Sequence, residues 1–146
     1  MTEEKLPEKF YGAFKLERKE NFDAFMAAKG HKWLFRKLMN LPSFGVEISR
    51  SDLGMGKYHF KQLCSGKVHY EWDFKLGEPF DTKACSGGTH RVTFTTDGDS
   101  LFEKHILLDE EGKPEETNVY TIEGDCLVET LSHGEVSAKR FMKKQL

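Results

Sequence analysis

The chain has 146 residues, of which 38% are hydrophobic and 12% aromatic, and its formal net charge is −2. These values predict one domain over residues 1–146 with enough apolar side chains for a compact core. The nearly balanced charge argues against the basic field that binding of nucleic acid requires. No window approaches about eighteen apolar residues, and the first ten residues mix acidic and basic side chains, so neither a membrane span nor a secretory signal is expected.

The three cysteines are Cys64, Cys85 and Cys126, and none belongs to a Cys-x-x-Cys pair. An odd number of cysteines without this pairing favours free thiols in a reducing compartment. The six histidines are scattered along the chain without a His-x-x-x-His pair. We therefore expect a cytoplasmic protein that holds no metal or cofactor and catalyses no reaction.

The first elements in the chain are predicted to be one strand and two short helices. A polar extension over residues 1–9 precedes a strand that ends near Leu16. Asn21 is a residue type that caps helices, and three apolar residues follow it at helical spacing before Gly30, namely Phe22, Phe25 and Met26. A second amphipathic helix is expected over residues 31–40. Because helices of fewer than about twelve residues are marginal alone, both should pack on an apolar surface.

From about residue 44 to residue 143, the apolar pattern has the period of two that is typical of strands. Turn signals recur about every ten residues, as expected for an antiparallel meander. These signals lie at Gly66, Gly77, Gly88, Gly98, Gly112, Gly124 and Gly134. A long run of strands with a helical lid near its start indicates a closed β-barrel, and barrels of more than about eight strands leave room for a small ligand.

Arg140 is the candidate for binding an anionic ligand inside this barrel. It shares the parity of Val136, Ala138 and Met142, which places it on an apolar face of the last strand. A buried carboxylate needs a cation, because an unpaired buried charge is strongly unfavourable. The alternative is an arginine that faces solvent.

Several short motifs occur in one order along the chain. They are Gly12-Ala13-Phe14-Lys15-Leu16, Asn21-Phe22-Asp23, Phe74-Lys75-Leu76-Gly77 with Phe80-Asp81, Thr96-Asp97-Gly98, and Leu131-Ser132-His133-Gly134 followed by Arg140. In these motifs the chain resembles the intracellular lipid-binding proteins, a family that comprises the fatty acid-binding proteins and their retinoid-binding relatives. The resemblance extends from about residue 10 to residue 144.

The resemblance implies an all-β fold. The expected architecture is a ten-stranded antiparallel up-and-down β-barrel around a solvated cavity, with a helix-turn-helix lid over residues 21–40 between the first and second strands. It also implies a monomer that reversibly carries one long-chain fatty acid or related acyl lipid.

The resemblance also implies roles for individual residues. Arg140 matches the family's carboxylate-binding arginine, whereas Tyr120 stands where many members have a second arginine and Met142 where they have a tyrosine. Tyr120 either donates its hydroxyl or fills space. The other residues expected to bind the ligand are Phe22, Met26, Trp72, Phe74, His105 and Leu131.

Glu129 is an acidic residue at a position that the family pattern places inside the barrel, close to Arg140 across a hairpin. A shift of one residue in the register would instead turn it to solvent. An inward, ionised Glu129 would partly neutralise Arg140. It would then favour neutral head groups such as amides, esters or alcohols over a free fatty acid.

The strand over residues 101–108 gives two conflicting indications. The family register places Glu103 and His105 inside the barrel. The apolar periodicity of Phe102, Ile106 and Leu108 indicates the opposite orientation. Ordered water in a polar interior would accommodate both sets of side chains.

The second predicted helix supplies a candidate surface for delivery of the ligand. Trp33 falls among cations, away from the apolar face of the helix, and the basic residues expected near the portal are Lys32, Arg36, Lys37 and Lys67. This combination favours transient contact with an anionic membrane. The alternative for Trp33 is packing on the barrel rim.

A second hypothesis is a lipid-signalling protein that carries its ligand to a nuclear receptor or another protein partner. Arg36 and Lys37 match two basic positions that form a nuclear-import surface in some members of the family, whereas Ala27 replaces the third. This hypothesis adds the nucleus to the expected cytoplasmic location.

Overall fold

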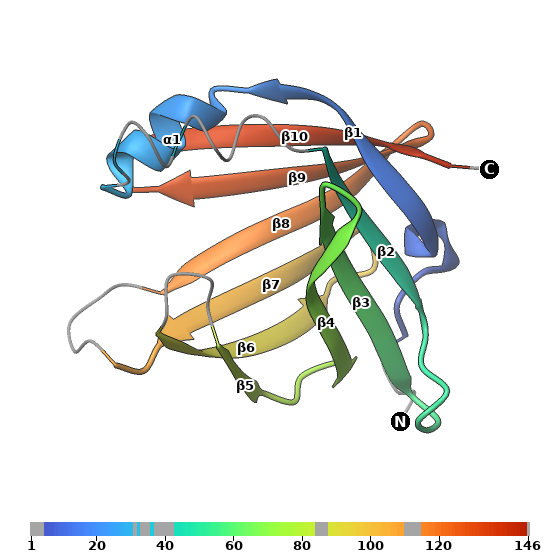
Figure 1. The fold of residues 1–146 in the computed structure, drawn as a ribbon. Coiled ribbons are helices and arrows are strands. Elements are labelled where there is room, and N and C mark those ends of the chain that lie inside the picture. Colours follow the sequence, from blue (N-terminus) through green and yellow to red (C-terminus); the bar gives the residue numbers. More distant parts are fainter. Residues whose placement is uncertain are drawn as a thin grey trace.

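The computed structural model describes residues 5–30, 32, 36, 43–83, 88–109 and 115–145. Within them the chain forms one short 3₁₀ helix, one α-helix and ten strands (Figure 1). The helices are the 3₁₀ helix Glu8–Phe10 and α1 Phe22–Ala28. The strands are β1 Gly12–Glu20, β2 Phe44–Arg50, β3 Lys57–Cys64, β4 Lys67–Lys75, β5 Phe80–Lys83, β6 Thr89–Thr96, β7 Ser100–Leu107, β8 Glu116–Glu123, β9 Cys126–His133 and β10 Val136–Lys144.

The strands form one antiparallel sheet in the order β4-β3-β2-β1-β10-β9-β8-β7-β6-β5. Consecutive strands pair with each other except β4 and β5, and β1 pairs with β10 to join the two ends of the run. The sheet therefore curls into a barrel that is nearly closed, with β4 and β5 as its two unpaired edges. The ten-stranded antiparallel barrel expected from the sequence is confirmed.

Only part of the predicted lid lies within the described residues. The α-helix between β1 and β2 is α1, which matches the first predicted helix. The second predicted helix, over residues 31–40, lies outside the described residues except at positions 32 and 36. The backbone N–H of Arg36 donates to the carbonyl oxygen of Lys32 at 3.0 Å.

The first strand is longer than the sequence pattern predicts. β1 continues past Leu16 to Glu20, and its register with β10 shifts between Leu16 and Arg18. Such a bulge breaks the strict alternation of inward and outward side chains, so the apolar pattern ends before the strand does. The Arg18 guanidinium covers the ring of Phe141 at 3.6 Å from its centroid, which supports the pairing beyond the bulge.

Asn21 does not act as the predicted side-chain cap of α1. Its backbone lies in the left-handed region, with φ of 58°, and its side chain makes no capping hydrogen bond. Instead, its amide nitrogen donates to the carbonyl oxygen of Ser137 at 2.9 Å and so ties the start of α1 to β10. The helix then packs on β9 and β10 through a buried cluster (Figure 1). The members of this cluster are Phe22, Phe25, Met26, Leu131 and Ala138.

The described part of the N-terminal segment is a structural component of the barrel. Leu6 and Phe10 are 2% and 0% exposed and belong to the main core cluster. The backbone N–H of Leu6 also donates to the Tyr58 hydroxyl at 3.0 Å. The expectation of a merely polar extension over residues 1–9 is therefore wrong for Leu6. One leucine among polar and charged residues forms no periodic pattern, so its burial could not be predicted from the sequence.

Aromatic side chains fill much of the barrel interior. Phe74 and Phe94 stack with their ring centroids 4.2 Å apart, and Phe60 lies 5.6 Å from Trp72 and 5.3 Å from Phe94. These separations are typical of favourable aromatic pairs. The remaining space lies between this cluster and α1. In the described part of the chain, no helix is long and apolar enough to cross a membrane.

Candidate functional site

A cavity of about 190 Å³ lies inside the barrel beneath α1. Aromatic and aliphatic side chains form part of its wall, and titratable side chains form much of the rest. The lining residues are Phe25, Lys29, Phe60, Gln62, Tyr70, Trp72, His90, Glu103, His105, Glu116, Asn118, Glu129, Leu131 and Arg140. The cavity therefore combines an apolar surface with a polar end.

Arg140 and Glu129 form a buried hydrogen-bonded pair at this polar end. They lie directly opposite each other in the register of β10 and β9, and they are 8% and 1% exposed. The Nε and one terminal nitrogen of Arg140 each lie 2.6 Å from Glu129 Oε1. The guanidinium also stands 3.8 Å from the ring centroid of Phe44 and 5.0 Å from that of Phe22. The predicted inward orientation of both residues is confirmed, and the solvent-facing alternatives are wrong.

The hydroxyl of Tyr120 lies between two buried carboxyl groups. It is 2.6 Å from Glu103 Oε1 and 2.9 Å from Glu129 Oε2, and Tyr120 is 1% exposed. Burial, together with the charges of Glu103 and Glu129, raises the pKa of the Tyr120 phenol well above its ordinary value. Tyr120 therefore keeps its proton and acts through its hydroxyl as well as through its bulk.

Glu103 and His105 both face the cavity from β7. His105 Nε2 contacts Glu103 Oε2, and the amide nitrogen of Asn118 lies 3.5 Å from the same oxygen. The family register was thus right for this strand. The apolar pattern misled because Phe102 and Ile106, which are only half-buried, face away from the cavity.

The contact between Glu103 and His105 changes the pKa of both groups. Burial opposes ionisation of Glu103, but the charge and hydrogen bond of His105 outweigh it and lower the pKa of Glu103. Burial also opposes the His105 cation, but the charge of Glu103 outweighs it and raises the pKa of His105. Both shifts favour an ion pair inside the barrel.

The chain of polar contacts ends at His90 on β6. Its Nδ1 lies 3.2 Å from His105 Nδ1, and burial and the nearby His105 charge lower the pKa of His90. A neutral His90 can therefore accept a hydrogen bond from the Nδ1–H of a charged His105. Near this end of the cavity, Lys29, which follows α1 directly, contacts Glu116 Oε2 of β8 at 2.9 Å.

The other residues predicted to bind the ligand occupy two kinds of position. Trp72, His105 and Leu131 line the cavity. Phe74 and Met142 belong to the main core cluster, and Phe22 and Met26 to the cluster beneath α1. The sequence-based prediction omitted the lining residues Phe25, Lys29, Phe60, Gln62, Tyr70, His90, Glu116 and Asn118. Phe25 was detectable, because it shares the apolar helical face of Phe22.

Three of the five predicted portal residues lie within the described residues. Lys32 and Lys67 are exposed, whereas Arg36 contacts Asp23 Oδ1 of α1 at 3.1 Å. Trp33 and Lys37 lie outside the described residues. Within the described residues, no group of three or more His, Cys, Asp or Glu side chains could hold a metal ion.

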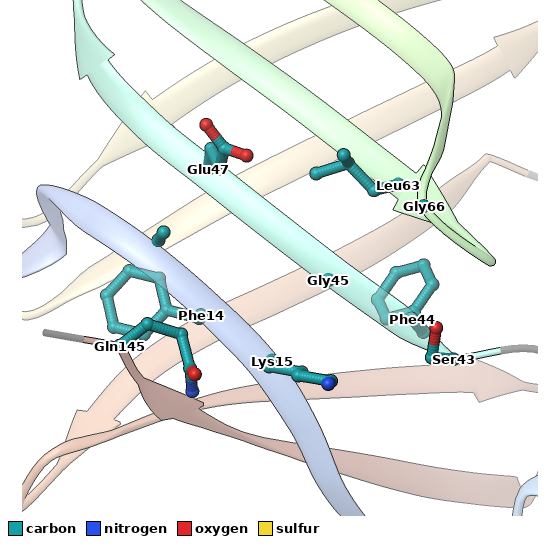
Figure 2. Close-up of a pocket in the computed structure, with 10 residues that line it drawn as sticks. Phe14, Lys15, Ser43, Phe44, Gly45, Glu47, Leu63, Gly66 and Gln145 are labelled. Atoms are coloured by element: carbon teal, nitrogen blue, oxygen red, sulfur yellow. The ribbon is translucent and has the colours of Figure 1, made fainter.

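A separate hollow of about 250 Å³ lies on the outer face of β1 and β2 (Figure 2). Gly45 lies beneath it, and a Cβ atom there would stand 2.9 Å from the carbonyl oxygen of Phe14. Lys15, Glu47 and Leu63 border the hollow; Lys15 is exposed, and Glu47 and Leu63 are partly exposed. This hollow lacks a buried charged group, so the interior cavity is the better candidate site.

No family model matches the chain. Curated relatives do, and three are a fatty acid-binding protein homolog 2 of Caenorhabditis elegans, a fatty acid-binding protein homolog of Ascaris suum and the human intestinal fatty acid-binding protein. Their identities to this chain are 35%, 37% and 30%. The alignments cover 97%, 96% and 92% of this chain and 87%, 86% and 98% of the relatives.

Solved structures agree with these sequence matches. As-p18, described as an extracellular fatty acid binding protein, has 35% identity and a TM-score of 0.89 over 97% of this chain and all of its own. A Schistosoma mansoni fatty acid binding protein, solved with arachidonic acid, has 25% identity and a TM-score of 0.79 over 94% of this chain and 97% of its own. The identity, the coverage and the shared barrel lead to one conclusion: this chain belongs to the fatty acid-binding protein family.

Proposed function

We propose that this protein binds one long-chain fatty acid or related acyl lipid, without a covalent bond, in the cavity beneath α1 and carries it between membranes. The observation that carries the proposal is the buried Arg140 at the polar end of a cavity that also has aromatic walls. The relatives named as fatty acid-binding proteins support it. The Schistosoma mansoni protein, which was solved with arachidonic acid, supports the same ligand class.

The two ends of an acyl lipid match the two kinds of wall. Each CH₂ group removed from water contributes about 0.8 kcal/mol, so the aromatic wall favours a long chain. A carboxylate head group needs a cation and hydrogen-bond donors, and the guanidinium of Arg140 supplies both. In this proposal Trp72, Leu131 and Phe25 contact the chain, while His105 and Glu129 belong to the head-group end.

The cavity volume implies that binding moves side chains. Pockets for ligands of this size usually enclose about 300 to 1,000 Å³, and the cavity measures about 190 Å³. The packing of α1 on β9 and β10 rests on a few side chains, of which Phe25 also lines the cavity. We expect α1 and Phe25 to shift outward as the acyl chain enters. Phe22, Met26, Phe74 and Met142 would then form the outer wall of the enlarged site.

Displacement of a fluorescent fatty acid by oleate tests the proposal. The wild-type protein should show one saturable site per chain. Arg140→Gln should weaken oleate binding at least about tenfold, because a charge-assisted hydrogen bond contributes about 1.5–3 kcal/mol. Lys139→Gln is the matched control, since Lys139 is the exposed neighbour of Arg140 on β10. Failure of every long-chain lipid to displace the probe would contradict the proposal.

For delivery, we propose contact between an anionic membrane and the portal residues Lys32, Trp33, Arg36, Lys37 and Lys67. The exposure of Lys32 and Lys67 supports this surface, while the contact of Arg36 with Asp23 partly neutralises it. Transfer of ligand to vesicles should accelerate with anionic lipid and should slow in a Lys32→Glu, Arg36→Glu, Lys37→Glu variant. Transfer that ignores vesicle charge and concentration would contradict this mechanism.

Delivery to a nuclear receptor or another protein partner is the alternative to membrane transfer. Ligand-dependent movement into the nucleus would favour it over the membrane mechanism. Because As-p18 is described as extracellular, the cytoplasmic location expected from the cysteines stays a prediction. Fractionation of cells that express the protein, with and without added fatty acid, would test both points.

A further inference from the structure

The hydroxyl of Tyr120 makes two contacts that a single proton cannot supply. It lies 2.6 Å from Glu103 Oε1 and 2.9 Å from Glu129 Oε2, and both distances are typical of O–H···O hydrogen bonds. A phenol has one proton to donate, and an ionised carboxylate has none. One of the two carboxyl groups must therefore carry a proton, which it donates to the Tyr120 oxygen.

The contacts place this additional proton on Glu129. The carboxylate of Glu103 faces donors from Tyr120, His105 and Asn118, which is the environment of an anion. Arg140 uses Oε1 of Glu129 and leaves Oε2 to hold a proton toward Tyr120. Burial raises the pKa of Glu129 despite the nearby Arg140 charge, in agreement with this assignment.

The charges on all the packed elements then give the polar end an excess of one positive charge. Arg140 of β10 and His105 of β7 are cationic, Glu103 of β7 is anionic, and Glu129 of β9 and Tyr120 of β8 are neutral. Two further charged groups, Lys29 at the C-terminal end of α1 and Glu116 of β8, compensate each other. Lys19 of β1, which pairs with Arg140 in the strand register, does not line the cavity, and burial and the Arg140 charge lower its pKa. Ionisation of Glu129 would cancel the excess charge.

We propose that Glu129 sets the head-group preference of the cavity by carrying or releasing one proton. With the proton in place, Arg140 is available to a fatty acid carboxylate, because its contacts with Glu129 use only part of its five N–H donors. Without the proton, Glu129 neutralises Arg140 and neutral acyl lipids are preferred. The inference rests on the proposed function. The preference for neutral head groups that was expected from the sequence then applies only when Glu129 is ionised.

The test compares the affinities of oleate and oleoyl ethanolamide between about pH 6 and about pH 9 at constant ionic strength. If only protonated Glu129 admits the carboxylate, the ratio of oleate affinity to ethanolamide affinity falls by up to about tenfold per pH unit above the pKa of Glu129. Glu129→Gln, which cannot ionise, should hold the ratio at its low-pH value throughout. Glu123→Gln, an exposed carboxylate on β8, should keep the wild-type dependence.

Calorimetry on the wild-type protein gives a second measurement that needs no variant. Titrations in two buffers with different ionisation enthalpies should show proton uptake on oleate binding above the pKa of Glu129, and none on ethanolamide binding. A ratio that is constant with pH, or an unchanged slope in Glu129→Gln, would overturn the proton mechanism while leaving lipid binding intact. Failure of both ligands to bind at every pH would overturn lipid binding as well.

Discussion

At the scale of single residues, Tyr120 is the central connection in the polar end of the cavity. Its hydroxyl contacts Glu103 on one side and Glu129 on the other. The side chains of both partners are almost completely buried, so neither can replace a lost hydrogen bond with bulk water. Removal of this one oxygen should therefore affect the whole network.

We expect Tyr120→Phe to lower the free energy of unfolding by about 1–3 kcal/mol, because two buried carboxyl groups each lose one hydrogen-bond partner. Tyr11→Phe is the matched control, since the Tyr11 hydroxyl takes part in an exposed contact with Arg50. The control should change stability by less than about 0.5 kcal/mol. Urea unfolding measures both values. Equal effects of the two substitutions would show that the Tyr120 hydroxyl is not needed.

His105 should make stability depend on pH. Burial opposes its cation, but Glu103 outweighs burial and raises the pKa of His105 above the ordinary value of 6.5. The stabilisation is therefore fully present below about pH 6.5 and is lost as the pH rises through the higher folded-state pKa. The difference in unfolding free energy between wild type and His105→Gln should shrink between about pH 6 and about pH 9. A difference that stays constant over this range would contradict the assigned ion pair.

At the scale of elements, two short segments complete the barrel. The N-terminal segment contributes Leu6 and Phe10 to the core, and α1 covers the cavity. Neither could be stable alone, because the described helices have only three and seven residues. Their folded conformation therefore depends on contacts with strands that are distant in the sequence.

Leu6→Ala tests the N-terminal segment. Leu6 is 2% exposed, and truncation of a buried leucine usually lowers stability by about 2–5 kcal/mol. The exposed neighbour Lys5 provides the control, and Lys5→Ala should have an effect below about 0.5 kcal/mol. Denaturant titration followed by tryptophan fluorescence measures the change. If Leu6→Ala unfolds at the wild-type denaturant concentration, this segment does not support the barrel.

Lys29→Met tests whether α1 governs release of the ligand. The 2.9 Å contact between Lys29 and Glu116 joins α1 to β8, which lies on the other side of the cavity. A partly exposed ion pair contributes up to about 1 kcal/mol, so its loss should raise the dissociation rate of a fluorescent fatty acid by up to about fivefold. Stopped-flow dilution measures this rate, with Lys32→Met as the control. Identical dissociation rates in the two variants would show that this contact does not govern release of the ligand.

At the scale of the whole molecule, local signals predicted most of the barrel. The turns predicted at Gly66, Gly77, Gly98, Gly124 and Gly134 are confirmed, because a tight turn often needs the positive φ that each of these glycines has. Parity along the strands placed Arg140 inside, and the neighbouring hairpin turn fixed the register that brings Glu129 opposite. These features depend on residues close together in the sequence.

Features that depend on contacts between residues far apart in the sequence could not be predicted. The amide of Asn21 bonds a carbonyl group of β10, so a local capping rule could not assign its role. Glu103, Tyr120 and Glu129 meet only because three neighbouring strands pair in one particular register. The additional proton follows from the distances between their oxygen atoms, which no sequence pattern contains.

Native mass spectrometry of the purified protein with added oleate tests the central claim most directly. The cavity beneath α1, with the buried guanidinium of Arg140, should give a single adduct, corresponding to one oleate per chain, at near-stoichiometric concentration. Arg140→Gln should reduce this adduct under the same conditions, whereas Lys139→Gln should retain it. The absence of an adduct, or successive adducts without preference for the first, would contradict binding inside the barrel.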